Sequence, residues 1–199
     1  QYAISVTTVP WVDGADCTAE FGSNECEGRP GGEVRLLQFP FPDAADGYVG
    51  DAYRFESPAN YRWARRELVM LIRYALRQTL LHFPGTKQLG IGDICQRDGI
   101  TPGYDIGSPR HPESTHDQGS NIDLAYFTTL ADAGALPYNQ IRTVCDATQG
   151  HNDGSFCTSG ASATHVVDLP RQVYFMAQLF AYPRLRVIGV DRVLAPLLV

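Results

Sequence analysis

Apolar residues recur at intervals of three and four between about residues 58 and 82, which is the spacing of one face of an α-helix. Ser57 is a suitable N-cap, and Pro58 is favoured at the first helical position. The dipeptide Pro84-Gly85 ends the pattern. The sequence therefore predicts a helix over about 58–82 with a buried face made of Leu68, Leu71, Ile72, Ala75, Leu76, Thr79 and Leu80.

The other apolar segments are shorter and are separated by polar loops. A second helix is expected over about 169–181, with Asp168 as its N-cap. Helices interleaved with a few strands predict an α+β fold. The remaining expected elements are strands at Val34–Phe39, Lys87–Ile94, Ile122–Phe127 and Arg184–Val190, a short helix at Pro137–Val144, and an apolar segment at Val193–Val199.

Two regions of the chain differ in composition. Residues 1–57 are rich in proline and glycine and predict an irregular, turn-rich arm, whereas residues 58–199 carry the long periodic segments and form the predicted domain. With 199 residues, 44% of them hydrophobic, the chain can bury one sizeable core. The apolar ending of the chain, Leu197-Leu198-Val199, predicts a domain that is interrupted at its C-terminal end.

The cysteines favour an oxidising compartment. Cys17 and Cys26 flank one polar loop, and Cys145 and Cys157 flank another, so both spacings suit short-range disulfides. The chain does not begin with Met, which a removed signal peptide explains, although an artificial chain boundary looks the same. We therefore predict a secreted or periplasmic protein. Cys95 is left over, either as a buried thiol or as the partner of a cysteine outside this chain.

Charge and hydropathy exclude two classes of partner. The formal charge is −6, and nucleic acids or anionic membranes require a basic face. No run of 18 apolar residues occurs, so no membrane-spanning helix is expected.

Candidate metal ligands gather between residues 111 and 123. Catalytic zinc takes three protein ligands with nitrogen or oxygen donors and leaves one position for water. His116 and Asp123 can converge on one ion if the chain turns tightly between them, and Gly119 supplies such a turn. His111 lies just upstream and is expected beside the metal or the substrate rather than as one of the two ligands. With Ser114 two residues before the histidine, the pattern is S-x-H-x-x-G-x-x-x-D.

This pattern resembles the signature of the LAS metallopeptidases, which include D-alanyl-D-alanine carboxypeptidases, the Hedgehog-type domain and the MepA-type murein endopeptidases. The resemblance implies that His116 and Asp123 bind Zn²⁺. The segment His111-Pro-Glu-Ser-Thr-His116 is similar to the paired histidines of the MepA branch, and the likeness extends loosely over about residues 60–199. Asn121 stands where the family usually has a small residue.

The resemblance also carries expectations about fold, substrate and activity. It implies a small antiparallel sheet flanked by helices, and a secreted or periplasmic zinc hydrolase of peptide bonds that acts on peptidoglycan or a similar peptide. Gln96 and Arg97 lie where family members have a residue that recognises the substrate, and a surface loop with solvated side chains explains them equally well. Ser114 caps the turn or contacts the substrate.

The third zinc ligand is the point at which the sequence departs from the family. LAS enzymes take it from a later H-x-H motif, and this chain contains none. The motif either follows Val199, in a processed segment or a second chain, or is replaced by His165, for which a capping or packing role is the simpler interpretation. The alternative function is a non-catalytic LAS-like module for binding or assembly, with a structural metal or none.

Overall fold

A computed structural model of the chain describes residues 36–42, 52–130, 138–142, 144, 155–157 and 163–198. These residues form a mixed α+β fold, as predicted, with two α-helices and several short strands. The helices are α2 (Arg66–His82) and α3 (Leu169–Phe180), with the short 3-10 turns η1 (Ala59–Tyr61), η2 (Tyr104–Ile106) and η4 (Ala195–Leu197). The strands are β1 (Leu36–Gln38), β2 (Tyr53–Phe55), β3 (Trp63–Arg65), β4 (Leu89–Ile91), β5 (Thr128–Leu130), β6 (Ser155–Cys157) and β7 (Ala163–Val167).

The described strands pair into three small sheets. Strands β1 and β3 are antiparallel, β5, β7 and β6 form an antiparallel sheet in that order, and β2 and β4 are parallel. The expectation of one antiparallel sheet is therefore wrong for the central pair. Because α2 connects β2 to β4 as a crossover helix, the two strands run in the same direction.

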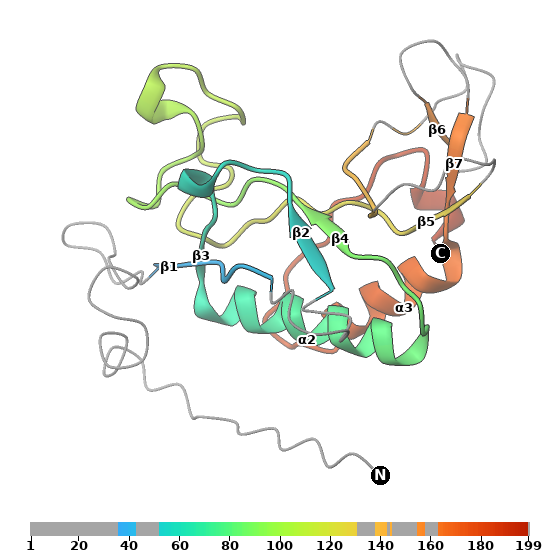
Figure 1. The fold of residues 1–199 in the computed structure, drawn as a ribbon. Helices are drawn as coiled ribbons and strands as arrows, with labels where there is room; N and C mark the ends of the chain where they lie inside the picture. The colour runs from blue at the N-terminus through green and yellow to red at the C-terminus, as the bar shows by residue number, and fades with distance from the viewer. Residues whose placement is uncertain are drawn as a thin grey trace.

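The core lies between the central strands and the two helices (Figure 1). Helix α2 turns Val69, Ile72 and Leu76 inward, as its apolar spacing predicts, and α3 packs against α2 with Phe175. The strands β2 and β4 contribute fully buried side chains to the same cluster. Two strands from before residue 58, β1 and β2, thus pair with strands of the predicted domain.

Helix α2 begins at Arg66 rather than at residue 58, so Ser57 is not its N-cap. Ser57 instead donates a hydrogen bond from its hydroxyl to the carboxylate of Asp93, and its carbonyl accepts hydrogen bonds from the guanidinium of Arg62. The residues that follow pair with β1 as strand β3. Tertiary contacts therefore divert this segment from the helix that its local signals favour.

Helix α3 agrees with its prediction. Asp168 is the N-cap, and its side chain accepts a hydrogen bond from the backbone N–H of Arg171 at 3.1 Å. A proline follows in the first turn, where its missing N–H costs nothing.

Three other predicted elements are wrong. Residues 122–127 make only one isolated bridge, between Leu124 and Ile91, and the strand starts at Thr128. Residues 184–190 form no strand, because Leu185 and Ile188 pack onto the core without a pairing partner. The described part of 137–144 contains no helical residue, and Asn139 bridges to Leu89 instead.

Some predictions fall on residues that lie outside the described part of the chain. Cys17, Cys26 and Cys145 belong there, and only the strand backbone of Cys157 is described. Their disulfides therefore stay predictions. Cys95 is fully buried, and its thiol lies 3.0 Å from the carbonyl oxygen of Trp63. None of the described helices has the length and hydropathy needed to cross a membrane.

Candidate metal centre

The loop that carries the candidate ligands is tightly curled by left-handed backbone conformations. Ser114, His116 and Gln118 have φ angles of 65°, 51° and 51°, and Gly119 has 65°. Non-glycine residues rarely adopt such angles, and each costs about 1 kcal/mol, so the surrounding structure has to hold them. Gly119 supplies the predicted tight turn with its positive φ. A Cβ atom at this position would also lie 2.4 Å from the side chain of Leu36 and 2.7 Å from the backbone nitrogen of Arg65.

Hydrogen bonds from outside the loop supply that support. The N–H of Gln118 donates to the carbonyl of Gly99 at 2.7 Å, and Arg65 Nε donates to the carbonyl of Gln118 at 2.9 Å. The hydroxyl of Thr101 donates to the carbonyl of Thr115 at 2.6 Å. The loop is therefore fixed on both sides of His116.

Asp123 is held by the backbone that follows β4. Its N–H donates to the carbonyl of Asp93 at 3.0 Å, and its carbonyl accepts from Gly92 N–H at 2.9 Å. This close approach requires glycine, because a Cβ at Gly92 would lie 2.9 Å from the Cβ of Asp123. The carboxylate itself is 44% exposed and points to a solvent-accessible site.

His116 is oriented from both sides of its ring. Its Nδ1 lies 3.1 Å from the carbonyl oxygen of Asp93, and its Nε2 lies 3.2 Å from Oδ1 of Asp123. A carbonyl oxygen only accepts, so Nδ1 carries a proton. The second nitrogen then faces a carboxylate with its lone pair unless it holds a proton or a cation.

The electrostatic balance at His116 reflects this arrangement. Burial is the largest influence and lowers the pKa of His116, but the hydrogen bonds and charges of Asp123 and Asp93 outweigh it and leave the pKa raised. A proton and a cation therefore compete for the position between His116 and Asp123.

His111 completes the cluster. Its Nε2 lies 3.7 Å from Oδ2 of Asp123 and 3.0 Å from Oδ2 of Asp93. Its ring stacks on that of His116 with 4.0 Å between the centroids and 20° between the planes. His111 was expected only as a group beside the metal or the substrate, and the structure brings it into the same three-residue group as His116 and Asp123.

Asp93 contacts the cluster, although the sequence-based prediction did not include it. It is 4% exposed, and its carboxylate receives hydrogen bonds from Ser57 and His111 and an ion pair from Arg110 Nε at 2.9 Å. An acidic residue two positions after the buried strand β4 is the signal that could have identified it, because a charge in such a position needs partners. Asp93 thus orients His111 by its side chain and His116 by its carbonyl.

The geometry can be tested against zinc chemistry. Donor atoms about 2.0–2.2 Å from zinc lie about 3.3–3.6 Å apart in a tetrahedron. His116 Nε2 lies 3.2 Å from Oδ1 of Asp123 and His111 Nε2 lies 3.7 Å from Oδ2, so the two distances fall near that range on different oxygens of the same carboxylate. One donor from each residue lies within 4.8 Å of the others. Two imidazoles and a carboxylate also match the nitrogen and oxygen donors that zinc accepts. The residues therefore fit the ion.

The other predicted site residues lie in different environments. Gln96 is buried, and its side chain donates to the carbonyl of Thr101 at 2.7 Å. Arg97 is exposed, with its guanidinium 5.6 Å above the ring of Trp63, and Ser114 is exposed. The structure does not bring His165 to the cluster: His165 lies on β7 and lines a separate pocket.

Comparison of the chain with protein-family models, with curated proteins and with solved structures gives no match. The evidence for a function therefore comes from the geometry of this cluster.

Proposed function

We propose that the protein is a zinc-dependent hydrolase of peptide bonds, with His111, His116 and Asp123 as the metal ligands. The observation that carries this proposal is the open, three-donor cluster. Structural zinc sites are closed, four-coordinate and usually rich in cysteine, whereas catalytic sites have three protein ligands and a free position. The side chains of His111, His116 and Asp123 are 21%, 12% and 44% exposed, so water and substrate have access to such a position.

Each residue of the cluster has a definable task. His116 offers Nε2, because its Nδ1–H is held by the carbonyl of Asp93. Asp123 offers a carboxylate oxygen from a backbone fixed against β4. Asp93 accepts a hydrogen bond from Nε2 of His111 in the metal-free protein, so this nitrogen would exchange its proton for the ion when it binds. The carboxylate of Asp93 also contributes negative charge beside the ion, which favours binding of a dication. When bound, zinc lowers the pKa of a water ligand to about 7 and polarises a carbonyl.

The substrate class rests on the resemblance to LAS metallopeptidases, which suggests peptidoglycan peptides. That family assignment stays a prediction, as do a secreted or periplasmic location, the H-x-H segment beyond Val199 and the substrate roles of Gln96, Arg97 and Ser114. His111 provides a third donor within this chain, so zinc binding requires neither His165 nor that segment.

A non-catalytic module that binds the same ion is the second candidate, and one observation favours it. Among the described residues, Asp93 is the further carboxylate in contact with the cluster, and its oxygens are engaged by Ser57, Arg110 and His111. A carboxylate held in this way is poorly available as a general base for the attacking water. Metal binding without hydrolysis would therefore identify the module.

Zinc content of the purified protein is the direct test. We expect about one equivalent of zinc in the intact protein and a loss of affinity of at least about 100-fold in His116→Ala, His111→Ala and Asp123→Ala, because each removes a ligand. His82→Ala is the matched control, since the ring of His82 stacks on Tyr174 at 4.2 Å and takes no part in the cluster.

Two further measurements separate the candidates. Equal zinc loss in His165→Ala and none in His111→Ala would overturn our ligand set. Incubation with isolated peptidoglycan, with and without EDTA, then distinguishes the functions: the enzyme releases peptide fragments only when zinc is present, and the module binds zinc but releases none.

A further inference from the structure

His165 lies in an unusual environment for a polar side chain. It is 6% exposed, and neither of its ring nitrogens has a hydrogen-bonding partner among the described residues. Burying such a group without a partner costs about 1–3 kcal/mol, so native structures normally satisfy it with protein, water or a ligand. Within the described part of the chain, the imidazole of His165 therefore has unused hydrogen-bonding capacity.

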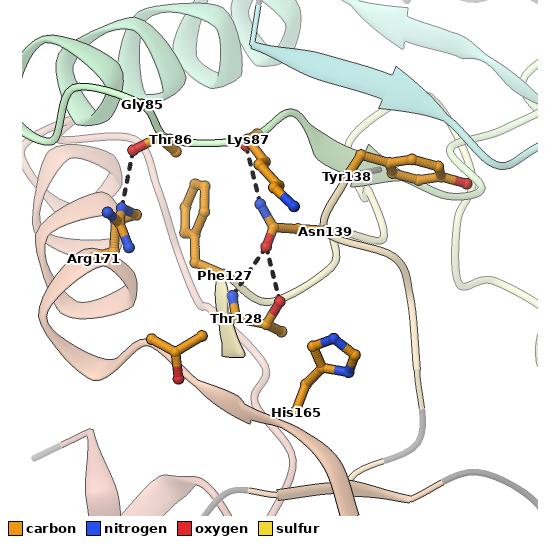
Figure 2. A pocket seen from close by; sticks show the side chains of 10 residues that line it. Gly85, Thr86, Lys87, Phe127, Thr128, Tyr138, Asn139, His165 and Arg171 are labelled. Atoms are coloured by element: carbon orange, nitrogen blue, oxygen red, sulfur yellow. Dashed lines mark hydrogen bonds between the residues drawn. The ribbon is translucent and has the colours of Figure 1, made fainter. Parts of the chain in front are cut away.

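The ring faces a pocket of about 250 Å³. Figure 2 shows the imidazole rising from β7 toward the wall formed by Thr128 and Asn139, with Lys87 above them and Arg171 on the other side of Phe127. Lys87 and Thr129 are exposed, so the pocket is reachable from solvent. Its volume suits a small molecule or the end of a larger one.

The polar atoms of the pocket wall divide into two groups. Asn139 is saturated: its side-chain oxygen accepts from the N–H and the hydroxyl of Thr128, and its side-chain nitrogen donates to the carbonyls of Lys87 and Gln88. It builds the wall but offers little to a ligand. His165, Lys87 and Arg171 are the remaining nitrogen-bearing side chains of the lining.

Two of those three groups are cationic, and the lining contains no acidic residue. Arg171 uses Nε for the hydroxyl of Thr86 at 2.9 Å and Nη1 for Asp168, which leaves N–H donors on its second terminal nitrogen. A ligand that accepts hydrogen bonds and carries negative charge complements this set.

The pocket is separate from the metal cluster. Gly92 pairs with Asp123 just beyond one end of β4, whereas Gly90 N–H donates to the carbonyl of Asn139 on the pocket side. Lys87 and Asp93 are six positions apart along extended chain, a span of up to roughly 20 Å.

We propose that this pocket is a second binding site, which takes a small ligand bearing an oxyanion, a carboxylate or a phosphate, through His165, Lys87 and Arg171. The proposal does not depend on zinc or on hydrolysis.

Amide NMR of the intact chain tests the site directly. Titration with acetate, inorganic phosphate and neutral acetamide separates the two anion sources from uncharged polar ligands. We expect saturable shifts of the Thr128, Thr129 and Asn139 amides with at least one anion, with a Kd on the order of 1 mM, and no saturation with acetamide. The Gly92 and Asp123 amides report on the metal cluster and should not move.

Three variants define the binding groups. Lys87→Gln and His165→Gln should each weaken anion binding by about tenfold, because the first removes a cation from the lining and the second removes the imidazole that faces the pocket. Arg186→Gln is the matched control, since it removes an exposed cation that does not line the pocket and should leave the affinity unchanged. Lys87 is exposed, so its variant remains informative if the buried His165→Gln fails to fold.

Three results would overturn the proposal: no saturation with either anion up to about 50 mM, equal binding of acetamide, or unchanged affinity in Lys87→Gln. Saturation by acetate identifies a carboxylate ligand and saturation by phosphate a phosphate ligand. None of these results depends on whether the cluster at His116 binds zinc.

Discussion

The two histidines His116 and His165 lie toward opposite ends of β4 and differ in how their rings are held. His116 has a partner for each nitrogen, a carbonyl on one side and a carboxylate on the other. His165 is more deeply buried and has no partner for either nitrogen among the described residues. The first ring is therefore preorganised for an ion at a known position, whereas the second has its donors and acceptors available for a ligand.

Charge follows the same division. Asp93 and Asp123 surround the rings of His111 and His116, which favours a cation. Lys87 and Arg171 line the pocket of His165, which favours an anion. The regions at the two ends of β4 thus present opposite charge, although each contains a histidine.

Among the changes that test this contrast, we expect the largest effect from replacing Asp93 at the metal end. We expect Asp93→Asn to lower zinc affinity by about 10–100-fold, because it removes negative charge beside the ion and loosens the ring of His111. Competition with a chelating dye measures the change. Asp117→Asn, in the same loop as His116, is the matched control, and an equal loss of affinity there would mean that general charge, rather than the contacts of Asp93, is responsible.

Two glycine substitutions in and just after β4 should affect zinc binding and anion binding separately. In Gly92→Ala the added Cβ meets Asp123 at 2.9 Å, whereas in Gly90→Ala it meets the side chain of Glu56 at 2.2 Å and the carbonyl of Asn139 at 2.9 Å. We expect Gly92→Ala to weaken zinc binding by about tenfold with little effect on anion binding, and Gly90→Ala to do the reverse.

Zinc competition and anion titration by NMR, made on both variants, check this crossed pattern. If both substitutions weaken both ligands equally, the two sites are not independent and the contrast between them is wrong.

The smallest effect is on the pH dependence of stability in the metal-free protein. Burial, the largest influence, lowers the pKa of His116, but Asp123 and Asp93 leave it raised above 6.5. A raised folded-state pKa contributes stability that is complete below the unfolded value and is lost as pH rises through the folded value. We expect the free energy of unfolding in EDTA to fall above pH 6.5 by up to about 1 kcal/mol.

Urea unfolding across this pH range measures the effect, and His116→Gln should remove most of it. A decline of the same size in that variant would assign the pH dependence to other groups.

The sequence predicted α3 well because its signals are local and agree. Apolar spacing, a proline in the first turn and the cap Asp168 all point to the same start. The start of α2 was misjudged because Ser57 is a good cap locally, yet Asp93, 36 residues away, takes its hydroxyl. The alternating apolar residues at 184–190 indicated a strand, but Leu185 and Ile188 pack on the core without pairing in a sheet.

The residues of the candidate site also divide into those that local sequence identified and those that depend on tertiary packing. His116 and Asp123 are close in sequence, and the turn at Gly119 was readable from composition. The roles of His111 and Asp93 depend on how the loop docks on the end of β4, which no local pattern encodes. The pocket at His165 requires the segment before β4 to pack together with β5, β7 and α3, so no local pattern in the sequence indicates it.

Lys87, one of the exposed residues that line the pocket, is also the one lysine among the 199 residues. Every reagent that couples to side-chain amines, such as a cross-linker, an acyl donor or an activated resin, will therefore attach to this molecule at the pocket. Immobilisation through this side-chain amine would block the pocket and leave the carboxylate-rich cluster facing solution, whereas coupling through carboxyl groups can reach Asp123, whose side chain is 44% exposed. The choice of surface chemistry in a binding assay thus decides which of the two sites is observed.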